Sequence, residues 1–272
     1  MNPPSLRTIG LTAWAVAVAG LVLFPVYLVL MVSVAPGPAL FGERPALMVT
    51  APTLVYWRRV LARGELLGPM AKSLVVATAA TGLAVALAAP GAYAVSRWPL
   101  RRRHAVLVAL LLARMLPELA VGVSLATRFA RLGLVDTYLG VTLAHVIGAL
   151  PFITWILVGA FAGIPVDLEE AAGLDGASWL KTLRSVILPA AGPAVAVAAL
   201  FVWLYSWNEF LYARLLTTSQ NTLPLQVFQA IDRGTKQQMA AVAAVLLVPI
   251  LFAVAFLQRY LRPDAMAGAL KG

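Results

Sequence analysis

Residues 139–162 read LGVTLAHVIGALPFITWILVGAFA, and this stretch decides the fold. It lies within an interval from Asp136 to Asp167 that contains no other charged residue. A helix needs about 20 predominantly apolar residues to cross the hydrocarbon core of a bilayer. Lipid cannot satisfy backbone polar groups, and the run is too long and too uniformly apolar for a barrel strand. The stretch therefore predicts a transmembrane helix.

The same pattern recurs along the chain. Four further intervals without Asp, Glu, Lys or Arg are each at least 22 residues long. A sixth candidate is apolar on both sides of an interruption by Arg114 and Glu118. We therefore predict an all-α membrane protein with one transmembrane domain over residues 1–272. Its six helices are expected at about 10–33, 73–95, 104–126, 139–162, 191–212 and 239–258.

Composition excludes several classes of function. The chain is 61% hydrophobic and 12% charged, and soluble domains carry roughly twice that charged share. It has no cysteine, which excludes disulfides, thiolate metal sites and a cysteine nucleophile. With 2 histidines and no phosphate-binding loop, we expect no metal site, no cofactor, no catalytic residue and no ATP hydrolysis by this chain. The net charge of +10 is typical of arginines near lipid headgroups rather than of nucleic-acid binding.

Residues 163–190 form the most informative loop. Four of the 11 acidic residues fall within nine positions, after Pro165. Proline and acidic side chains favour the first turn of a helix, which predicts a short helix from about 166 to 173. Asp175-Gly176 indicates a turn, and a second helix should follow with Trp179 and Leu183 on its apolar face. An amphipathic interfacial helix that only joins two spans is the alternative.

The spacing of this loop resembles the EAA loop of ABC importer permeases. The matching residues are Glu170, Ala171, Ala172, Gly176, Leu188 and Pro189, with Val186 at a position where the family usually has isoleucine. Asp175 before the glycine resembles the sugar-importer version. The resemblance implies a cytoplasmic coupling loop that docks in a cleft of an ATPase subunit, and cytoplasmic N- and C-termini. Lys and Arg counts do not decide orientation, because ten lie on each side.

Further motifs resemble maltose-type permeases, specifically the shorter of the two partners in such importers. They are Ala92–Arg97, Leu132–Thr137, Trp207–Phe210 and the tail Ala267–Gly272, in order along the chain. The resemblance implies an importer of a sugar or oligosaccharide in a bacterial or archaeal inner membrane, working by alternating access. Its partners would be a second homologous permease, two ATPase subunits that bind ATP and Mg, and an extracytoplasmic solute-binding protein. Lys271 would lie in a tail that contacts the ATPases.

Two groups of polar residues have alternative interpretations. Arg114 and Glu118 lie one helical turn apart at membrane depth, where a charge costs at least ~2.5 kcal/mol. They form either a self-neutralising pair between helices or part of the solute path. Trp207, Asn208 and Glu209 either anchor the fifth span at the interface or contact the solute or the second permease.

Three rival functions remain at this point. The first is an ABC permease for a solute that is not a sugar. The second is a secondary transporter driven by an ion gradient, for which Glu118 is the only deep carboxylate. The third is a membrane scaffold without a transport path.

Overall fold

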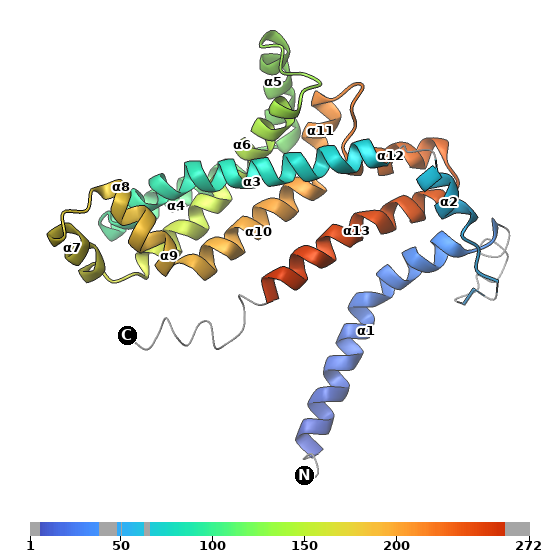
Figure 1. The fold of residues 1–272 in the computed structure, drawn as a ribbon, viewed down its shortest axis with the longest axis horizontal. Helices are drawn as coiled ribbons and strands as arrows, with labels where there is room; N and C mark the ends of the chain where they lie inside the picture. Colours follow the sequence, from blue (N-terminus) through green and yellow to red (C-terminus); the bar gives the residue numbers. More distant parts are fainter. Residues whose placement is uncertain (1–5, 38–47, 50, 63–65, 259–272) are drawn as a thin grey trace. The chain divides into compact units, whose positions relative to one another are not determined.

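The protein is helical throughout the residues that the structure, a computed structural model, describes: 6–37, 48–49, 51–62 and 66–258 (Figure 1). Its regular elements in these ranges are helices, in agreement with the predicted all-α class. The chain divides into two compact units. The first consists of Met1–Leu66 and Gln226–Val248, and the second of Leu67–Leu225 and Pro249–Gly272.

Four helices are long and apolar enough to cross a membrane. They are α1 (Leu6–Val34), α3 (Leu67–Ser96), α6 (Tyr138–Ala162) and α13 (Lys236–Gln258). Two further candidates are helix pairs with a sharp bend between their members. Residues 179–190 and α10 (Gly192–Asn208) meet at 86°, and α4 (Leu100–Arg114) and α5 (Glu118–Arg131) meet at 83°. If each bent pair is one span, the described residues contain up to six.

The stretch predicted as a span over 104–126 is not one straight helix. Helix α4 ends at Arg114, and α5 begins at Glu118 after Pro117. Proline has no N–H to donate and disfavours the helical conformation of the residue before it. The 83° bend between α4 and α5 follows from this break, although the stretch is apolar on both sides of it.

A row of alanines holds the second unit together. Helix α3 packs along α6 and α10, and its buried face carries small side chains at three- and four-residue spacing. The row consists of Ala77, Ala80, Ala84, Ala88 and Ala92, none more than 3% exposed. Small residues let two helix backbones approach closely, which is how helices associate in lipid. Larger side chains of the facing helices, among them Ile153 and Leu157 of α6 and Val202 of α10, fill the space beside the row.

A second close approach joins α6 to α10. A Cβ atom at Gly148 of α6 would overlap the hydroxyl of Tyr205 on α10. A larger residue at position 148 would therefore have to displace the Tyr205 side chain. The short helix α11 (Leu211–Leu216) then packs against α5 and α6.

The first unit contains α1 and the short helix α2 (Val55–Ala62). Met31 and Ala35 at the end of α1 are buried. The Trp57 indole N–H of α2 donates a hydrogen bond of 3.1 Å to the Ser33 hydroxyl oxygen of α1. Helix α12 (Leu223–Arg233) follows α11 in the chain.

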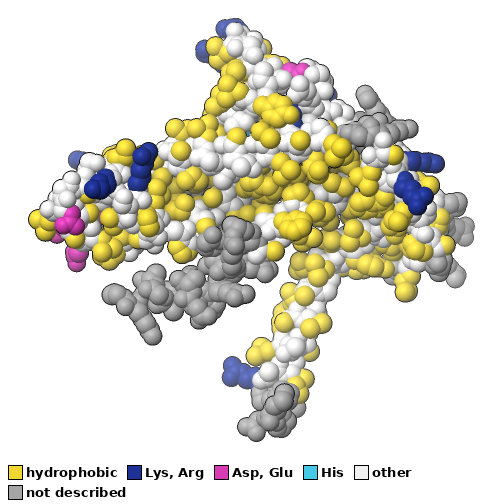
Figure 2. All heavy atoms as spheres, in the orientation of Figure 1, with side chains coloured by type: hydrophobic (Ala, Val, Ile, Leu, Met, Phe, Trp, Pro, Cys, Tyr) yellow, Lys and Arg dark blue, Asp and Glu magenta, His cyan; other side chains and the backbone are white. Residues whose placement is uncertain are grey.

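Large apolar side chains remain on the surface of these helices. Leu21 and Val22 of α1 are 76% and 66% exposed, and Phe252 of α13 is 73% exposed. Figure 2 shows hydrophobic side chains over the helix surfaces. Exposed apolar surface on this scale requires lipid or other subunits to cover it.

Because the alanine row packs closely, only small side chains should fit at these positions of α3. Replacing Ala84 by leucine should overpack the contact with α6 and α10 and lower stability by about 1–3 kcal/mol. Ala86→Leu makes the same change on an exposed position of the same helix and serves as the matched control. We expect a lower thermal unfolding midpoint for Ala84→Leu than for Ala86→Leu, measured on the purified protein in detergent. Equal midpoints for the two variants would contradict the packing argument.

Candidate functional site

The loop that follows α6 has the two short helices predicted from its sequence. Helix α7 covers Asp167–Leu174, and α8 covers Trp179–Thr182. A π-helical turn (Leu183–Ile187) and the short α9 (Leu188–Ala190) continue toward α10. Acidic residues occupy the first turn of α7, where the helix dipole favours negative charge. The loop is therefore a two-helix projection at one end of the second unit (Figure 1).

A glycine-terminated turn fixes the corner between α7 and α8. Gly176 has φ +74°, a conformation that favours glycine. Its N–H donates to the Gly173 carbonyl oxygen at 3.0 Å, and the Ala177 N–H donates to that of Ala172 at 2.9 Å. This pair of bonds is a Schellman motif, which satisfies the last carbonyls of α7. Ser178 then caps α8, and its hydroxyl accepts from the Lys181 N–H.

The outer surface of this loop combines carboxylates with exposed apolar side chains. Glu170 and Asp175 are exposed, and Leu174 between them is 91% exposed. Figure 2 shows acidic side chains at the end of the unit where α7 lies. Among the other predicted loop residues, Ala171 and Pro189 are exposed and Ala172 and Leu188 are half-buried. Leu168, Trp179 and Leu180 of the same loop are 45–50% exposed, so the projection carries several exposed apolar side chains beside its carboxylates.

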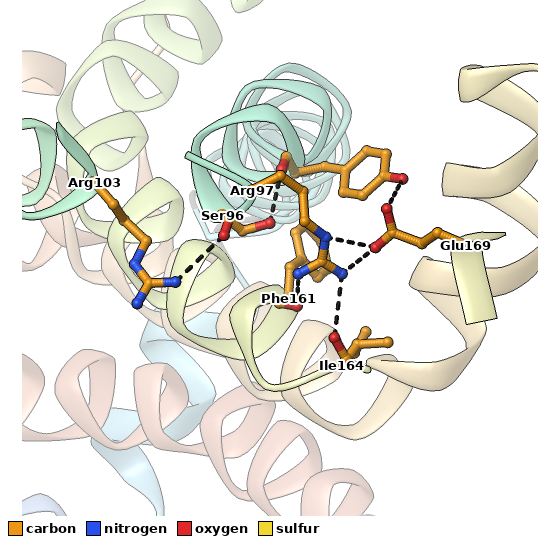
Figure 3. Close-up of polar contacts among 7 residues, drawn as sticks. Ser96, Arg97, Arg103, Phe161, Ile164 and Glu169 are labelled. Atoms are coloured by element: carbon orange, nitrogen blue, oxygen red, sulfur yellow. Dashed lines mark hydrogen bonds and ion pairs between the residues drawn. The ribbon is translucent and has the colours of Figure 1, made fainter. Parts of the chain in front are cut away.

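The inner surface of the loop is bound to the end of α3. Glu169 accepts hydrogen bonds from Arg97 and Tyr93, and Arg97 also donates to two backbone carbonyls (Figure 3). Arg97 and Tyr93 occur in a motif quoted from the sequence, but nothing in the sequence indicated that they contact Glu169. That pairing depends on how α3 and α7 meet in three dimensions.

Arg114 and Glu118 do not form the pair that one alternative predicted. Both lie in the described part of the chain, and both contact Tyr205 of α10. Arg114 donates to the Gly148 carbonyl oxygen of α6 at 2.9 Å, and its guanidinium lies 5.5 Å from the ring centre of Tyr205. Glu118 accepts a hydrogen bond of 3.3 Å from the Tyr205 hydroxyl. The two residues lie on either side of the bend at Pro117, and both side chains are exposed.

The Trp207, Asn208 and Glu209 segment has one exposed side chain. Trp207 is fully buried, Glu209 is 7% exposed, and Asn208 is exposed. The Glu209 carboxylate accepts from the Tyr212 N–H at 2.7 Å and the Ala213 N–H at 3.1 Å, which caps the start of α11. It also lies 2.9 Å from Nε2 of His145 on α6, whose Nδ1 lies 2.7 Å from the Ser206 hydroxyl oxygen. Glu209 thus joins α6, α10 and α11 inside the chain.

Asp136 organises the opposite end of the second unit. Its carboxylate accepts hydrogen bonds from the backbone N–H groups of Thr218, Ser219 and Gln220, at 3.0–3.2 Å, and from the Ser219 hydroxyl at 2.5 Å. The Ser219 hydroxyl, and then the backbone N–H groups, hold the pKa of Asp136 well below its usual range. Lys72 at the start of α3 donates to the Gln220 carbonyl oxygen at 2.5 Å. The loops after α5 and α11 are therefore fastened together beside α3.

The long apolar helices and the two-helix loop agree with the protein family that the sequence matches. Residues 80–266 match the family described as the binding-protein-dependent transport system inner membrane component. The chain belongs to this family. It is therefore a membrane permease of the ABC importer type and not an enzyme, which decides against the ion-gradient alternative.

Similar proteins cover the whole chain. The trehalose/maltose transport system permease protein MalG of Thermococcus litoralis is 32% identical over 100% of both chains. The trehalose transport system permease protein SugB of Mycobacterium tuberculosis is 32% identical over 96% of this chain and 98% of its own. Among solved structures, a bacterial ABC transporter that imports the acidic polysaccharide alginate matches with a TM-score of 0.76. That match covers 96% of this chain and 100% of the other at 21% identity, so it supports the fold.

The tail residue Lys271 lies outside the residues that the structure describes. The same holds for the whole C-terminal motif Ala267–Gly272. The role inferred for this tail therefore stays a prediction from the sequence.

The contacts of Asp136 predict a pH-dependent stability. Its folded-state pKa lies below the ordinary value of about 3.9, so the unfolded state takes up the proton more readily. The stabilisation of about 1 kcal/mol is present above pH ~4 and is lost progressively as the pH falls from there toward the folded-state pKa. Asp136→Asn lacks this stabilisation at every pH. We expect its unfolding midpoint to lie below that of the wild type at pH 7, and the difference to narrow steadily as the pH is lowered below about 4. A constant difference across this range would show that the carboxylate charge contributes nothing.

Proposed function

We propose that this chain is a channel-forming permease of an ATP-driven sugar importer, and that α7 and α8 form its docking site for the ATPase. The observation that carries the proposal is the projecting two-helix loop with Glu170, Leu174 and Asp175 on its outer surface. Because this chain has no phosphate-binding loop, ATP hydrolysis needs a partner subunit, and that subunit would bind ATP and Mg. Such a partner needs a rigid, exposed surface through which to act.

The structure of the loop suits mechanical transmission. The Schellman motif at Gly176 fixes the angle between α7 and α8 by backbone hydrogen bonds, without relying on flexible side chains. Leu174 presents an apolar anchor, and its acidic neighbours give the surface a negative charge. Docking would bury Leu174 in a cleft of the ATPase, as apolar anchors are buried in protein interfaces.

Several partners follow from this arrangement. The exposed apolar surfaces leave room for a second permease of the same family beside lipid. Two ATPase subunits would bind on the cytoplasmic side, and a solute-binding protein would bind on the other. A chain of a solved bacterial alginate ABC transporter, in complex with an alginate pentasaccharide-bound periplasmic protein, matches the fold of this chain with a TM-score of 0.57 over 78% of this chain's length. The loop would then be cytoplasmic, with both termini on the same side of an inner membrane.

The solute is proposed to be a sugar or an oligosaccharide. Relatives at 32% identity are named as trehalose or trehalose/maltose permeases. Arg114, Glu118 and Tyr205 supply polar groups at membrane depth beside the bend in the third predicted span. Side chains at such depth usually face a polar cavity, so we assign them to the wall of the solute path. Asn208 is assigned to a contact with the path or with the second permease, because its side chain is exposed.

Transport would proceed by alternating access. Closure of the ATPase subunits on ATP would move α7 and α8, and this motion would open the paired permeases toward the binding protein. The solute would enter the cavity, and hydrolysis would restore the inward-facing state. The same loop is also what a permease for another class of solute would need, so the solute class is tested separately, by screening ligands of the co-purified binding protein.

The docking site predicts a specific crosslink. The natural chain has no cysteine, so a single cysteine in place of Leu174 is the only thiol that this chain contributes. In the assembled complex, a short bifunctional maleimide should join Leu174→Cys to an ATPase subunit. Leu132→Cys, 70% exposed in the turn after α5, is the control and should not crosslink to it. An impermeant maleimide should label Leu174→Cys in inside-out vesicles and Leu132→Cys in right-side-out vesicles. Labelling of Leu174→Cys from the outside would refute the proposed topology.

The glycine corner predicts a charge-specific loss of transport. Gly176→Asn and Gly176→Asp have side chains of nearly equal size, and both residues tolerate positive φ better than other side chains do. The aspartate adds a charge at the docking surface, beside Asp175. We expect ATP-dependent uptake in vesicles to fall about tenfold or more for Gly176→Asp while Gly176→Asn keeps most of it. Equal uptake by the two variants would place the corner outside the interface, whereas loss of assembly by both would assign it a purely structural role.

A further inference from the structure

Arg97 follows directly after α3 and binds three different segments. Its Nε donates to Glu169 Oε1 at 2.5 Å, and its Nη2 also contacts that oxygen. Its Nη1 donates to the Phe161 carbonyl oxygen at 2.9 Å, and Nη2 donates to that of Ile164 at 3.3 Å. Figure 3 shows the guanidinium between the end of α6 and the start of α7. One side chain thus joins α3 to the last turn of α6 and to α7.

The adjacent glutamates of α7 have opposite environments. The Glu169 side chain is 15% exposed and faces Arg97, whereas Glu170 is exposed on the outer surface. Neighbours in a helix point about 100° apart, so consecutive acids can serve two surfaces. Glu169 therefore belongs to the interior contacts of this chain, and Glu170 is free to face a partner.

Tyr93, on the last turn of α3, contacts both helices of the loop. Its hydroxyl donates to Glu169 Oε2 at 2.6 Å, so that both carboxylate oxygens of Glu169 are bound to α3. Its ring stacks on Trp179 of α8, with centres 5.4 Å apart and planes at 24°. Phe161 of α6 meets the same ring edge-on at 6.5 Å. The end of α3 therefore contacts α7 through Glu169 and α8 through Trp179.

The chain segment that connects the loop to α10 is bent. The chain passes from α8 through the π-helical turn Leu183–Ile187 and meets α10 at 86°. The π turn lies within residues 179–190, and the bend comes at Ala191, where this segment meets α10. Helix α3, by contrast, is one helix of 30 residues, with Pro90 inside it, and packs along α6 and α10. Besides the chain connection from α6, the contacts of Glu169 and Trp179 give motion of the loop a direct route to α3.

From these contacts we infer that Arg97, through Glu169, is the positioning residue that transmits movement of the coupling loop to α3. The inference rests on the proposed function, because it assumes that a nucleotide-driven partner moves α7 and α8. Arg97 touches neither solute nor nucleotide in this scheme. Its role is to make the loop and the end of α3 move as one body, with the Tyr93–Trp179 stack holding the second helix of the loop.

The test compares ATP hydrolysis with uptake in the whole complex, reconstituted in vesicles with its binding protein. We expect Arg97→Gln and Glu169→Gln each to lower uptake about tenfold or more while ATP hydrolysis stays within about twofold of wild type. The double variant should be no worse than either single variant, because both remove the same contact. The charge exchange Arg97→Glu with Glu169→Arg should recover part of the uptake. Arg102→Gln, an exposed arginine on α4, is the matched control and should transport normally.

Several results would overturn the inference. They are uptake by Arg97→Gln equal to that of Arg102→Gln, additive losses in the double variant, or a parallel fall of hydrolysis and uptake. If Arg97→Gln fails to assemble, the comparison moves to Arg97→Lys, which keeps the charge but cannot reach Glu169 and two carbonyls together. Normal uptake by Arg97→Lys and by Tyr93→Phe would then refute it.

The crosslink from Leu174→Cys separates this inference from the proposed function. We expect the crosslink to the ATPase subunit to persist in Arg97→Gln, because Arg97 lies on the inner side of the loop. A crosslink that persists while uptake is lost supports transmission through Arg97. A crosslink absent from the otherwise wild-type chain would refute the docking site itself, and a crosslink lost only in Arg97→Gln would assign Arg97 to docking rather than to transmission.

Discussion

The second unit depends on the close packing of α3 against α6 and α10 through a row of alanines. Lipid tails are as apolar as the side chains, so burial of apolar surface does not by itself drive helices together in a membrane. They associate through close van der Waals contact of small residues instead. Ala80, Ala84, Ala88 and Ala92 recur every four residues and keep one face of the middle and second half of α3 narrow. The glycine at position 148 makes room for the Tyr205 side chain where α6 meets α10. This packing holds α3 in place in the second unit, so that the polar groups at its two ends can meet their partners.

Polar contacts fasten α3 at both ends. At its start, Lys72 binds the Gln220 carbonyl oxygen, and the Ser73 hydroxyl oxygen accepts from the Leu223 N–H at 2.8 Å. At its end, Tyr93 and Arg97 bind the loop that carries the EAA-like motif. Ion pairs and hydrogen bonds at the ends of a span avoid the cost of charge at the bilayer centre. A helix held in this way is suited to carry motion from one side of the membrane to the other.

The sequence predicted correctly those features that depend on residues close together in the chain. Hydropathy located the long helices α1, α3, α6 and α13, because hydrocarbon requires apolar segments of a given length. Proline, acidic residues and Asp175-Gly176 located α7 and its glycine corner, since caps and turns depend on a few neighbouring residues. In the third span, hydropathy did not show the 83° bend at Pro117, a residue whose missing N–H favours a kink.

The amino-acid sequence was sufficient to predict the class of the protein, the approximate spans, the family motifs and the position of the two-helix loop at 163–190. These follow from length, charge spacing and local backbone chemistry. Only the tertiary structure decided the partners of charged side chains. It gave Arg114 the Gly148 carbonyl oxygen and Glu118 the Tyr205 hydroxyl, placed Glu209 as an interior cap and joined Glu169 to Arg97 across 72 positions of the chain. A charged side chain in a membrane protein binds a polar group that helix packing brings close to it. The hydrophobic periodicity of the sequence does not show which groups these are.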